Sequence, residues 1–112
     1  MFNQFAQACY ENSKAHGFWE DYPIGQLPLE TVLAKLCLIH SEVSECLEAA
    51  RIDDMGLHYR IDGKPEGFPS EIADILIRVG DLAARMGIDL DQAVAEKMAF
   101  NTTRPHKHGK LA

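Results

Sequence analysis

The chain of 112 residues has 17 acidic and 11 basic residues, a formal net charge of −6 and a hydrophobic content of 46%. This length and apolar content predict one domain over residues 1–112, with a core that forms without covalent staples. The acidic balance argues against binding to nucleic-acid backbone or to an anionic membrane, because both need a cationic surface. No signal peptide is evident, and no apolar stretch approaches the 18 residues typical of a membrane span. Three cysteines without a CxxC pair favour a reduced, cytoplasmic setting.

The first half of the chain predicts two helices. Ala, Leu, Glu and Lys recur at helical spacing, and alternating β-branched runs are missing, so no sheet is expected. The first helix covers about residues 2–15, and a segment rich in Pro, Gly and aromatics then predicts an ordered loop. The second helix covers about residues 29–51, with Pro28 near its start. A long connection rich in Gly and Pro follows, and such a segment is either functional or mobile.

Two more helices are predicted in the second half. One covers about residues 69–86, with Gly87 as its stop. The other covers about residues 89–101, where Asp89 can cap the start and Gln92 follows three residues later, as in a capping box. A basic tail, residues 102–112, ends the chain. Four helices and no sheet predict an all-α four-helix bundle.

The second predicted helix is apolar on two sides. At 100° per residue its core stripe centres on Val43 and includes Leu29, Leu36 and Leu47, while Leu38 lies on the far side. Apolar residues on two faces predict burial on both. Either this helix is central in the fold or a second subunit covers its outer face, and we expect the second, in a homodimer or homotetramer.

Two pairs of acids interrupt these helices. Glu42 and Glu45 form an ExxE pair, and after 25 residues Glu71 and Asp74 form an ExxD pair. Residues three apart project from one side of a helix, and two antiparallel helices about 8–10 Å apart bring such pairs together. Converging carboxylates repel one another unless cations neutralise them. Their hard oxygen ligands suit Mg²⁺, with Mn²⁺ as the other option.

Ordinary explanations fit the same acids. Asp74 with Arg78, and Asp81 with Arg85, have the i,i+4 spacing of surface ion pairs, so the third helix could present a solvated face. The chain would then be a non-catalytic helical interaction module with an acidic face. A metal-dependent phosphohydrolase acting on another pyrophosphate-linked substrate is a further alternative.

Three stretches, "KLCLIHSEVSECLEAAR", "GKPEGFPSEIADILIRVGDLA" and "EKMAFNTTRPHKHGK", closely resemble the MazG-like family of all-α nucleoside triphosphate pyrophosphohydrolases. The resemblance covers about residues 29–110. It implies a helical bundle that cleaves a (d)NTP between its α and β phosphates, and a housecleaning role against non-standard nucleotides. It implies Mg²⁺ ligands and phosphate-binding residues at these positions: Glu42, Glu45, Glu71 and Asp74 for the metal, and Lys97, Asn101 and Arg104 for the phosphates. Many members carry one more acid directly before the first glutamate, where this chain has Ser41, so the number of metal ions stays open.

Roles follow for several of these residues. Glu42 or Glu45 would accept the proton of the attacking water. Lys97 and Arg104 would hold the β and γ phosphates, unless they are simply cations that favour a helix C-terminus.

Two alternative roles remain for the aromatic residues that would contact the base, and two for the C-terminal tail. Trp19, with Phe18, would stack on the base, unless the two form the core of their own loop. The basic tail is either a clamp over the triphosphate or a solvated terminus.

Overall fold

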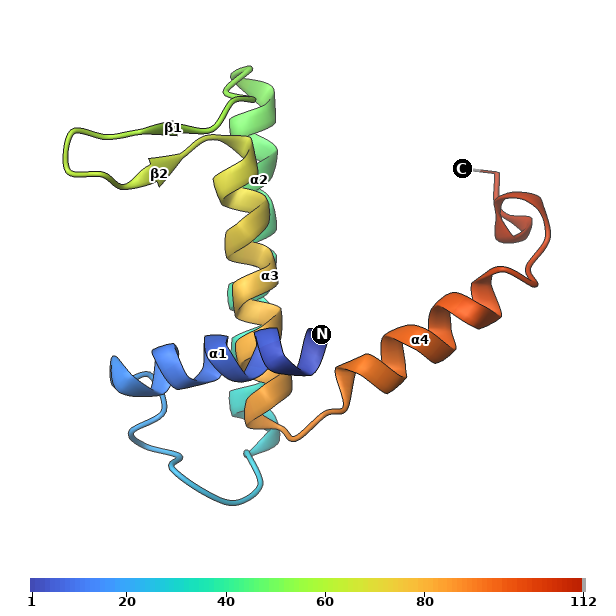
Figure 1. The fold of residues 1–112 in the computed structure, drawn as a ribbon, viewed down its shortest axis with the longest axis horizontal. Helices are drawn as coiled ribbons and strands as arrows, with labels where there is room; N and C mark the ends of the chain where they lie inside the picture. The colour runs from blue at the N-terminus through green and yellow to red at the C-terminus, as the bar shows by residue number, and fades with distance from the viewer. Residues whose placement is uncertain (112) are drawn as a thin grey trace.

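The structure is a computed structural model that describes residues 1–111 (Figure 1). It contains α1 (Phe2–Ala15), α2 (Leu29–Arg51), α3 (Phe68–Arg85) and α4 (Leu90–Asn101), the strands β1 (His58–Tyr59) and β2 (Pro65–Glu66), and a 3₁₀ helix, η1 (His106–Gly109). The predicted all-α class is confirmed, and each helix lies within one residue of its predicted bounds. Ala112, the last residue of the predicted tail, lies outside the described residues. None of the helices within residues 1–111 combines the length and hydropathy that crossing a bilayer requires.

Helix α3 is the centre of the fold, because both α1 and α2 pack against it (Figure 1). Small residues set the crossing of α1 over α3. Ala6 and Cys9 are buried on α1, and Gly80 faces them from α3. A Cβ on Gly80 would lie 3.2 Å from the Phe5 ring and 3.3 Å from the Cys9 sulfur, tighter than an ordinary contact. Glycine at this position therefore lets the two helices approach closely.

The loop between α1 and α2 is anchored by Trp19. This side chain is buried with Leu27 and Leu82, and its indole Nε1 donates a hydrogen bond of 2.8 Å to Asp81. The ammonium group of Lys35 lies 4.5 Å from the centre of the Trp19 ring, a cation–π contact. A buried aromatic with a satisfied N–H holds its segment in place. The predicted ordered loop is thereby explained.

Arg85 fixes the far part of the same loop. Its guanidinium donates to the carbonyl oxygens of Tyr22, at 3.0 and 3.2 Å, and of Gly25, at 2.9 Å. The predicted ion pair between Asp81 and Arg85 is wrong. Asp81 accepts a hydrogen bond from Trp19, and Arg85 donates hydrogen bonds to carbonyl oxygens of the loop. Tertiary partners have replaced the i,i+4 partner on the same helix.

A short antiparallel hairpin occupies the long connection between α2 and α3, with His58 opposite Glu66. The expectation of no strand is wrong here, because two residues per strand are too few to show alternation in a sequence. Gly67, buried at the end of the hairpin, has φ +102°, and a Cβ there would overlap the Gly56 carbonyl oxygen. Glycine at Gly67 thus lets the connection close directly onto the start of α3.

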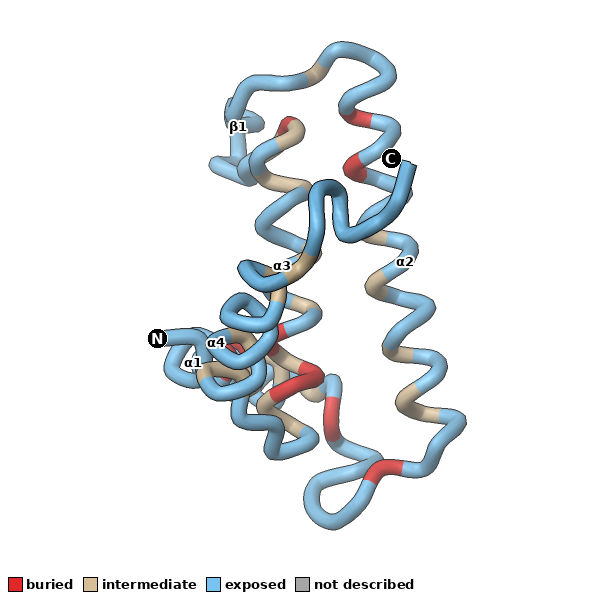
Figure 2. The backbone as a smooth tube through the Cα atoms, turned by 90° about the vertical axis from the view of Figure 1, so that its right-hand side faces the viewer, coloured by how far each residue is buried: buried red, intermediate tan, exposed pale blue. Residues whose placement is uncertain are grey.

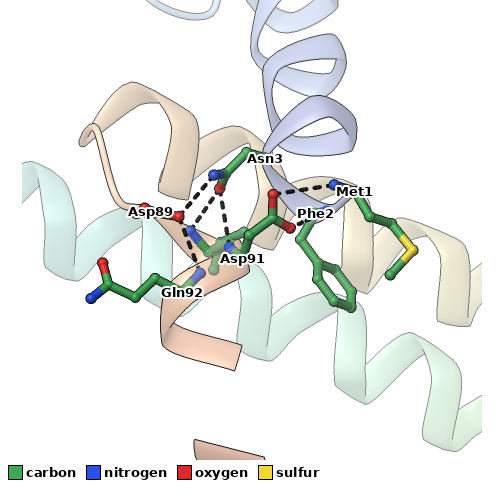
Figure 3. Close-up of polar contacts among 7 residues, drawn as sticks. Met1, Phe2, Asn3, Asp89, Asp91 and Gln92 are labelled. Atoms are coloured by element: carbon green, nitrogen blue, oxygen red, sulfur yellow. Dashed lines mark hydrogen bonds and ion pairs between the residues drawn. The ribbon is translucent and has the colours of Figure 1, made fainter. Parts of the chain in front are cut away.

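Helix α4 begins in a hydrogen-bonded cap shared with α1 (Figure 3). Asp89 accepts from the backbone N–H of Gln92 at 3.1 Å, so its predicted capping role is confirmed. The Asn3 side chain donates to Asp89 at 2.8 Å and accepts from the backbone N–H of Leu90 at 2.7 Å. The backbone N–H of Phe2 donates to the Asp91 carboxylate at 2.6 Å. The starts of α1 and α4 are therefore tied together.

Beyond this cap α4 projects away from the paired helices α2 and α3 (Figure 1). Within residues 90–101 no side chain is buried. The single chain therefore does not close the predicted four-helix bundle. The reason is visible in the sequence of α4, where apolar and polar residues alternate around the helix without a clear apolar face.

The chain is more open than a compact domain of its length. Its radius of gyration is 16.6 Å, against about 13 Å for a compact chain. Its accessible surface is 8374 Å², against about 6,200 Å² for a compact monomer of this mass. The predicted core stripe of α2 is largely exposed (Figure 2), with Leu29 at 69% and Leu47 at 61%. Two stripe residues, Val32 and Ile39, pack against the cluster of Trp19, Leu27 and Leu82, and the rest of the stripe is exposed.

The shared cap can be tested with Asn3→Ala. Loss of the side chain should remove three hydrogen bonds, to Asp89, Leu90 and Asp91 at the start of α4. Amide hydrogen exchange at Leu90 should become roughly 10-fold faster, which corresponds to about 1.4 kcal/mol. Gln4→Ala, at the exposed neighbouring position on α1, is the matched control. Equal exchange at Leu90 in the two variants would contradict this role for Asn3.

Candidate metal centre

Three of the four predicted metal ligands meet where α2 packs against α3. Glu42 and Glu45 come from the middle of α2, and Glu71 comes from the first turn of α3. One carboxylate oxygen from each lies within 4.8 Å of the others. An acid in a first helical turn is favoured by the helix dipole, which helps explain why Glu71 is tolerated there. The ExxE and ExxD spacing therefore does bring acids from two helices together.

The surroundings of Glu71 disfavour the negative charge of its carboxylate. Burial raises its pKa above the usual value, and the negative charges of Asp74, Glu45 and Glu42 raise it further. The carboxylate oxygen Oε2 of Glu71 is buried and has no hydrogen-bond partner among residues 1–111. An unsatisfied buried acceptor of this kind costs about 1–3 kcal/mol, and more when it is charged. The fold therefore leaves one acceptor unsatisfied in the middle of a repulsive cluster.

Asp74 lies one helical turn after Glu71 and belongs to the same electrostatic group. Partial burial of its carboxyl raises its pKa, and the charge of Glu42 adds to this, although the residue as a whole is exposed. Lys64 directly precedes β2, and its positive charge partly offsets the rise in the pKa of both Asp74 and Glu71. Sequence analysis missed Lys64, because only the fold of the hairpin brings it near the acids.

The donor set fits a hard divalent cation. Carboxylate oxygens from two helices converge, one buried oxygen lacks a partner, and burial together with the neighbouring negative charges raises the pKa of Glu71. A divalent cation would satisfy the orphaned oxygen of Glu71 and neutralise the repulsion. Mg²⁺ and Mn²⁺ suit such all-oxygen ligands.

Arg78 makes a cross-helix ion pair at the edge of the cluster. Its Nε donates to the Glu42 carboxylate at 2.6 Å, and the Glu42 side chain is only 13% exposed. The predicted pairing of Arg78 with Asp74 on the same helix is wrong as a hydrogen-bonded pair, because Arg78 reaches across to α2 instead. A partly buried, charge-assisted bond of this kind is stronger than an exposed i,i+4 pair.

Ser41 stands where many members of the resembling family carry a further acid. Its hydroxyl donates to the Leu38 carbonyl of its own helix at 2.6 Å. This back-bond keeps the side chain against α2. Ser41 is thus engaged with its own backbone and adds no charge to the cluster.

The predicted phosphate-binding residues gather elsewhere, at the outer end of α4. The Lys97 ammonium lies 5.8 Å and the Arg104 guanidinium 5.9 Å from the centre of the Phe100 ring. The amide oxygen of Asn101 is buried and has no hydrogen-bond partner among residues 1–111. Because α4 projects away from α2 and α3 (Figure 1), the structure collects these three residues but does not bring them to the acids of their own chain.

A cavity of about 270 Å³ adjoins the acids. Glu42, Asp74 and Arg78 line one part of it, and α1 and the following loop line another. The residues from that second part are Cys9, Asn12, Ser13, Phe18 and Trp19. Asn12 and Ser13 were missed by sequence analysis, since an amide and a hydroxyl on an amphipathic helix carry no spacing signal.

The two aromatic residues in this wall differ in availability. Trp19 is 2% exposed and its N–H is already bonded to Asp81, so the expectation that it belongs to the core of its loop is confirmed. Phe18 is 67% exposed and keeps a free ring face. Of the two, Phe18 is the ring that a flat ligand could reach without repacking the core.

Comparison of the chain with protein-family models, curated proteins and solved structures found no match. The functional proposal therefore depends on the chemistry of the site: converging carboxylates, an unsatisfied acceptor and a neighbouring cavity with polar walls.

Glu71→Gln tests the repulsion in this cluster. The pKa of Glu71 is raised in the folded state, so its proton adds stability that is present below the unfolded value and is lost as pH rises through the folded value. Without divalent cations, the variant should therefore be more stable than the original protein at pH 7, and this advantage should shrink as pH falls toward 4.5. With Mg²⁺ the order should reverse, because the variant loses a ligand.

Thermal unfolding with EDTA and with Mg²⁺, at several pH values, provides the measurement, and a gain of 1 kcal/mol corresponds to a rise in Tm of about 4 °C. Glu48→Gln, at an exposed position on α2 outside the cluster, is the control. A Glu71→Gln protein that is no more stable than the original at pH 7 and responds equally to Mg²⁺ would contradict this description.

Proposed function

We propose that the protein is a Mg²⁺-dependent nucleoside triphosphate pyrophosphohydrolase, which converts a (d)NTP and water to a (d)NMP and pyrophosphate. One observation carries the proposal: acids from two helices converge within 4.8 Å beside a cavity of about 270 Å³. The resemblance of the ExxE and ExxD stretches to MazG-like pyrophosphohydrolases points to the same reaction. An acidic protein needs such a cation site to hold a polyanionic substrate.

Glu42, Glu45, Glu71 and Asp74 would hold the metal ion. When bound, Mg²⁺ or Mn²⁺ would neutralise charge on the triphosphate and make a water molecule easier to deprotonate. Glu42 is engaged by Arg78, whereas Glu45 is exposed. Glu45 is therefore the carboxylate better placed to accept the proton of the attacking water, and Glu42 acts as a ligand held in orientation by Arg78.

The cavity is suited to the nucleoside part of the substrate. Sites that enclose a whole drug-sized ligand are about 300–1,000 Å³, so a cavity of about 270 Å³ fits a base better than a complete nucleotide. Asn12 and Ser13 offer hydrogen-bonding groups for a base edge, and Phe18 offers an exposed ring for stacking. With the base there, the phosphate chain would extend toward Glu42 and Asp74, which line the same cavity.

The proposal includes a homodimer or a homotetramer. The chain exposes about 2,200 Å² more than a compact monomer of its mass. Each partner in an obligate dimer typically buries about 1,000–2,500 Å². The exposed apolar stripe of α2 supplies the chemistry that such an interface needs.

Pyrophosphate release from a panel of NTPs and dNTPs with Mg²⁺ tests the reaction. Glu45→Gln should lower kcat/KM by at least about 100-fold, equivalent to about 2.7 kcal/mol of transition-state stabilisation. Glu48→Gln, one turn further along α2 and exposed, should keep near-normal activity.

Parallel reactions with NDPs and dinucleoside polyphosphates distinguish hydrolysis of another pyrophosphate-linked substrate. No release from any nucleotide, or equal release by the original protein and Glu45→Gln, would exclude the proposed reaction and favour a helical interaction module.

A further inference from the structure

Two charged side chains of the cavity wall meet at the Trp19 indole. The Asp81 oxygen Oδ1 accepts a hydrogen bond from the indole N–H at 2.8 Å, and the Lys35 ammonium lies 4.5 Å from the centre of the ring. Asp81 comes to the cavity from α3 and Lys35 from α2. Within residues 1–111 neither of them forms an ion pair. Both therefore keep hydrogen-bonding capacity that the fold does not use.

Asp81 has one acceptor oxygen to spare. Its Oδ1 holds Trp19, whereas its Oδ2 has no hydrogen-bond partner among residues 1–111, and the side chain is half-buried in the wall. Burial, and next the negative charge of Asp81, raise the pKa of the Cys9 thiol in the same wall. That thiol thus stays protonated at neutral pH, and Asp81 is the anionic acceptor in this part of the cavity.

The direction of hydrogen bonding is fixed at Asp81 and Lys35. A carboxylate only accepts and an ammonium only donates, whereas the Asn12 amide and the Ser13 hydroxyl can do either. The other charged residues of the wall already belong to the proposed metal centre: Glu42, Asp74 and Arg78. Around Trp19 the wall therefore presents one fixed acceptor and one fixed donor.

Asp81 lies at the end of the cavity that suits a base. It follows Asp74 by seven residues on α3, so the two project from the same side of the helix about 10 Å apart. In a nucleotide, the sugar and the ring place the edge of the base a comparable length from the α phosphate. Phe18, in the same wall, offers its exposed ring for stacking. Phosphates near Asp74 would thus leave the base near Asp81.

The edges of the bases differ in the direction of their hydrogen bonds. Cytosine and adenine carry an amino group, a donor, beside a ring nitrogen that accepts. Uracil, thymine and hypoxanthine carry a carbonyl oxygen beside a ring N–H, which is the reverse order. Against the reverse order, the Asp81 carboxylate would face another acceptor and the Lys35 ammonium another donor. Leaving polar groups of a site unpaired in this way is what rejects the wrong ligand.

We propose that this cavity selects nucleotides whose base carries an amino group beside an accepting ring nitrogen, as in cytosine and adenine. Asp81 accepts a hydrogen bond from the amino group, and Lys35 donates one to the ring nitrogen. The inference rests on the proposed pyrophosphohydrolase reaction for the rest of the ligand, a nucleoside triphosphate. Its consequence is that deaminated nucleotides are poor substrates, so a housecleaning role would concern amino-bearing bases modified elsewhere on the ring.

Matched pairs of nucleotides test the selection on the original protein. dCTP and dUTP differ by one amino group in place of a carbonyl oxygen, together with the proton on the neighbouring ring nitrogen, and so do dATP and dITP. In pyrophosphate release with Mg²⁺, kcat/KM should be at least about 10-fold higher for the amino member of each pair. Equal values within each pair, or higher values for the carbonyl members, would overturn the proposal.

Asp81→Asn tests the role of the carboxylate. The Trp19 N–H still needs an acceptor, so the oxygen of the introduced amide should face Trp19 and its NH₂ group the base. The ratio of kcat/KM for dCTP to that for dUTP should then fall at least about 10-fold. Asp21→Asn, at an exposed position of the same loop outside the cavity, is the matched control and should keep the ratio.

Fluorescence of Trp19, the only tryptophan of the chain, shows whether the Asp81→Asn protein keeps its indole buried. An unchanged preference for dCTP in a variant that does so would contradict the role of Asp81.

Binding of the product nucleotides separates this inference from the proposed reaction. Equilibrium dialysis of the original protein with dCMP and with dUMP should give a Kd at least about 10-fold lower for dCMP. Equal affinities, or no binding of either nucleotide, would overturn the base selection. If the protein prefers dCMP but releases no pyrophosphate from any triphosphate, the proposed reaction fails and the selection of the base stands.

Discussion

The site depends on like charges held together against their own repulsion. Close packing of α2 on α3 brings carboxylate oxygens of Glu42, Glu45 and Glu71 within 4.8 Å of one another, and burial together with the neighbouring charges raises the pKa of Glu71. Only one cationic side chain, Arg78, is hydrogen-bonded to this group within residues 1–111, and it reaches only Glu42. A divalent cation bound there would neutralise this repulsion, which makes the cluster a candidate metal site. That neutralisation is the physical basis for reading the acids as a functional site.

Most of the helical framework could be predicted from local signals. Proline near the start of α2, the Asp89 cap and the helical spacing of apolar residues set helix bounds to within one residue. The convergence of the Glu42 and Glu45 pair with Glu71 also follows from spacing, because three-residue separation places each pair on one side of its helix. Neither Asp–Arg pair predicted on α3 forms a hydrogen-bonded ion pair, although the charge of Arg78 acts to lower the pKa of Asp74. In both pairs the arginine is hydrogen-bonded to a group outside its own helix. Arg78 donates to the Glu42 carboxylate, and Arg85 donates to loop carbonyl oxygens.

The direction of α4 relative to the other helices could not be predicted from the sequence. Its direction depends on the side chain of Asn3, which lies 87 residues before Leu90 and has no local signal that marks it as a cap. The pocket residues Asn12 and Ser13, and the proximity of Lys64 to the acids, likewise depend on tertiary folding. The apolar stripe of α2, by contrast, could be predicted from the sequence. Its apolar character is plain in the sequence, and the structure adds that the single chain leaves most of it exposed.

On the proposed function, an open protomer holds the cation between α2 and α3 and covers its exposed apolar stripe with a second copy. The most direct test of its central claim is the anomalous diffraction of Mn²⁺ in crystals of the protein. The account predicts an anomalous peak between α2 and α3, with carboxylate oxygens of Glu42, Glu45 and Glu71 at coordination distance. Crystals soaked in Mn²⁺ that show no peak there, with the three carboxylates turned apart into solvent, would contradict it.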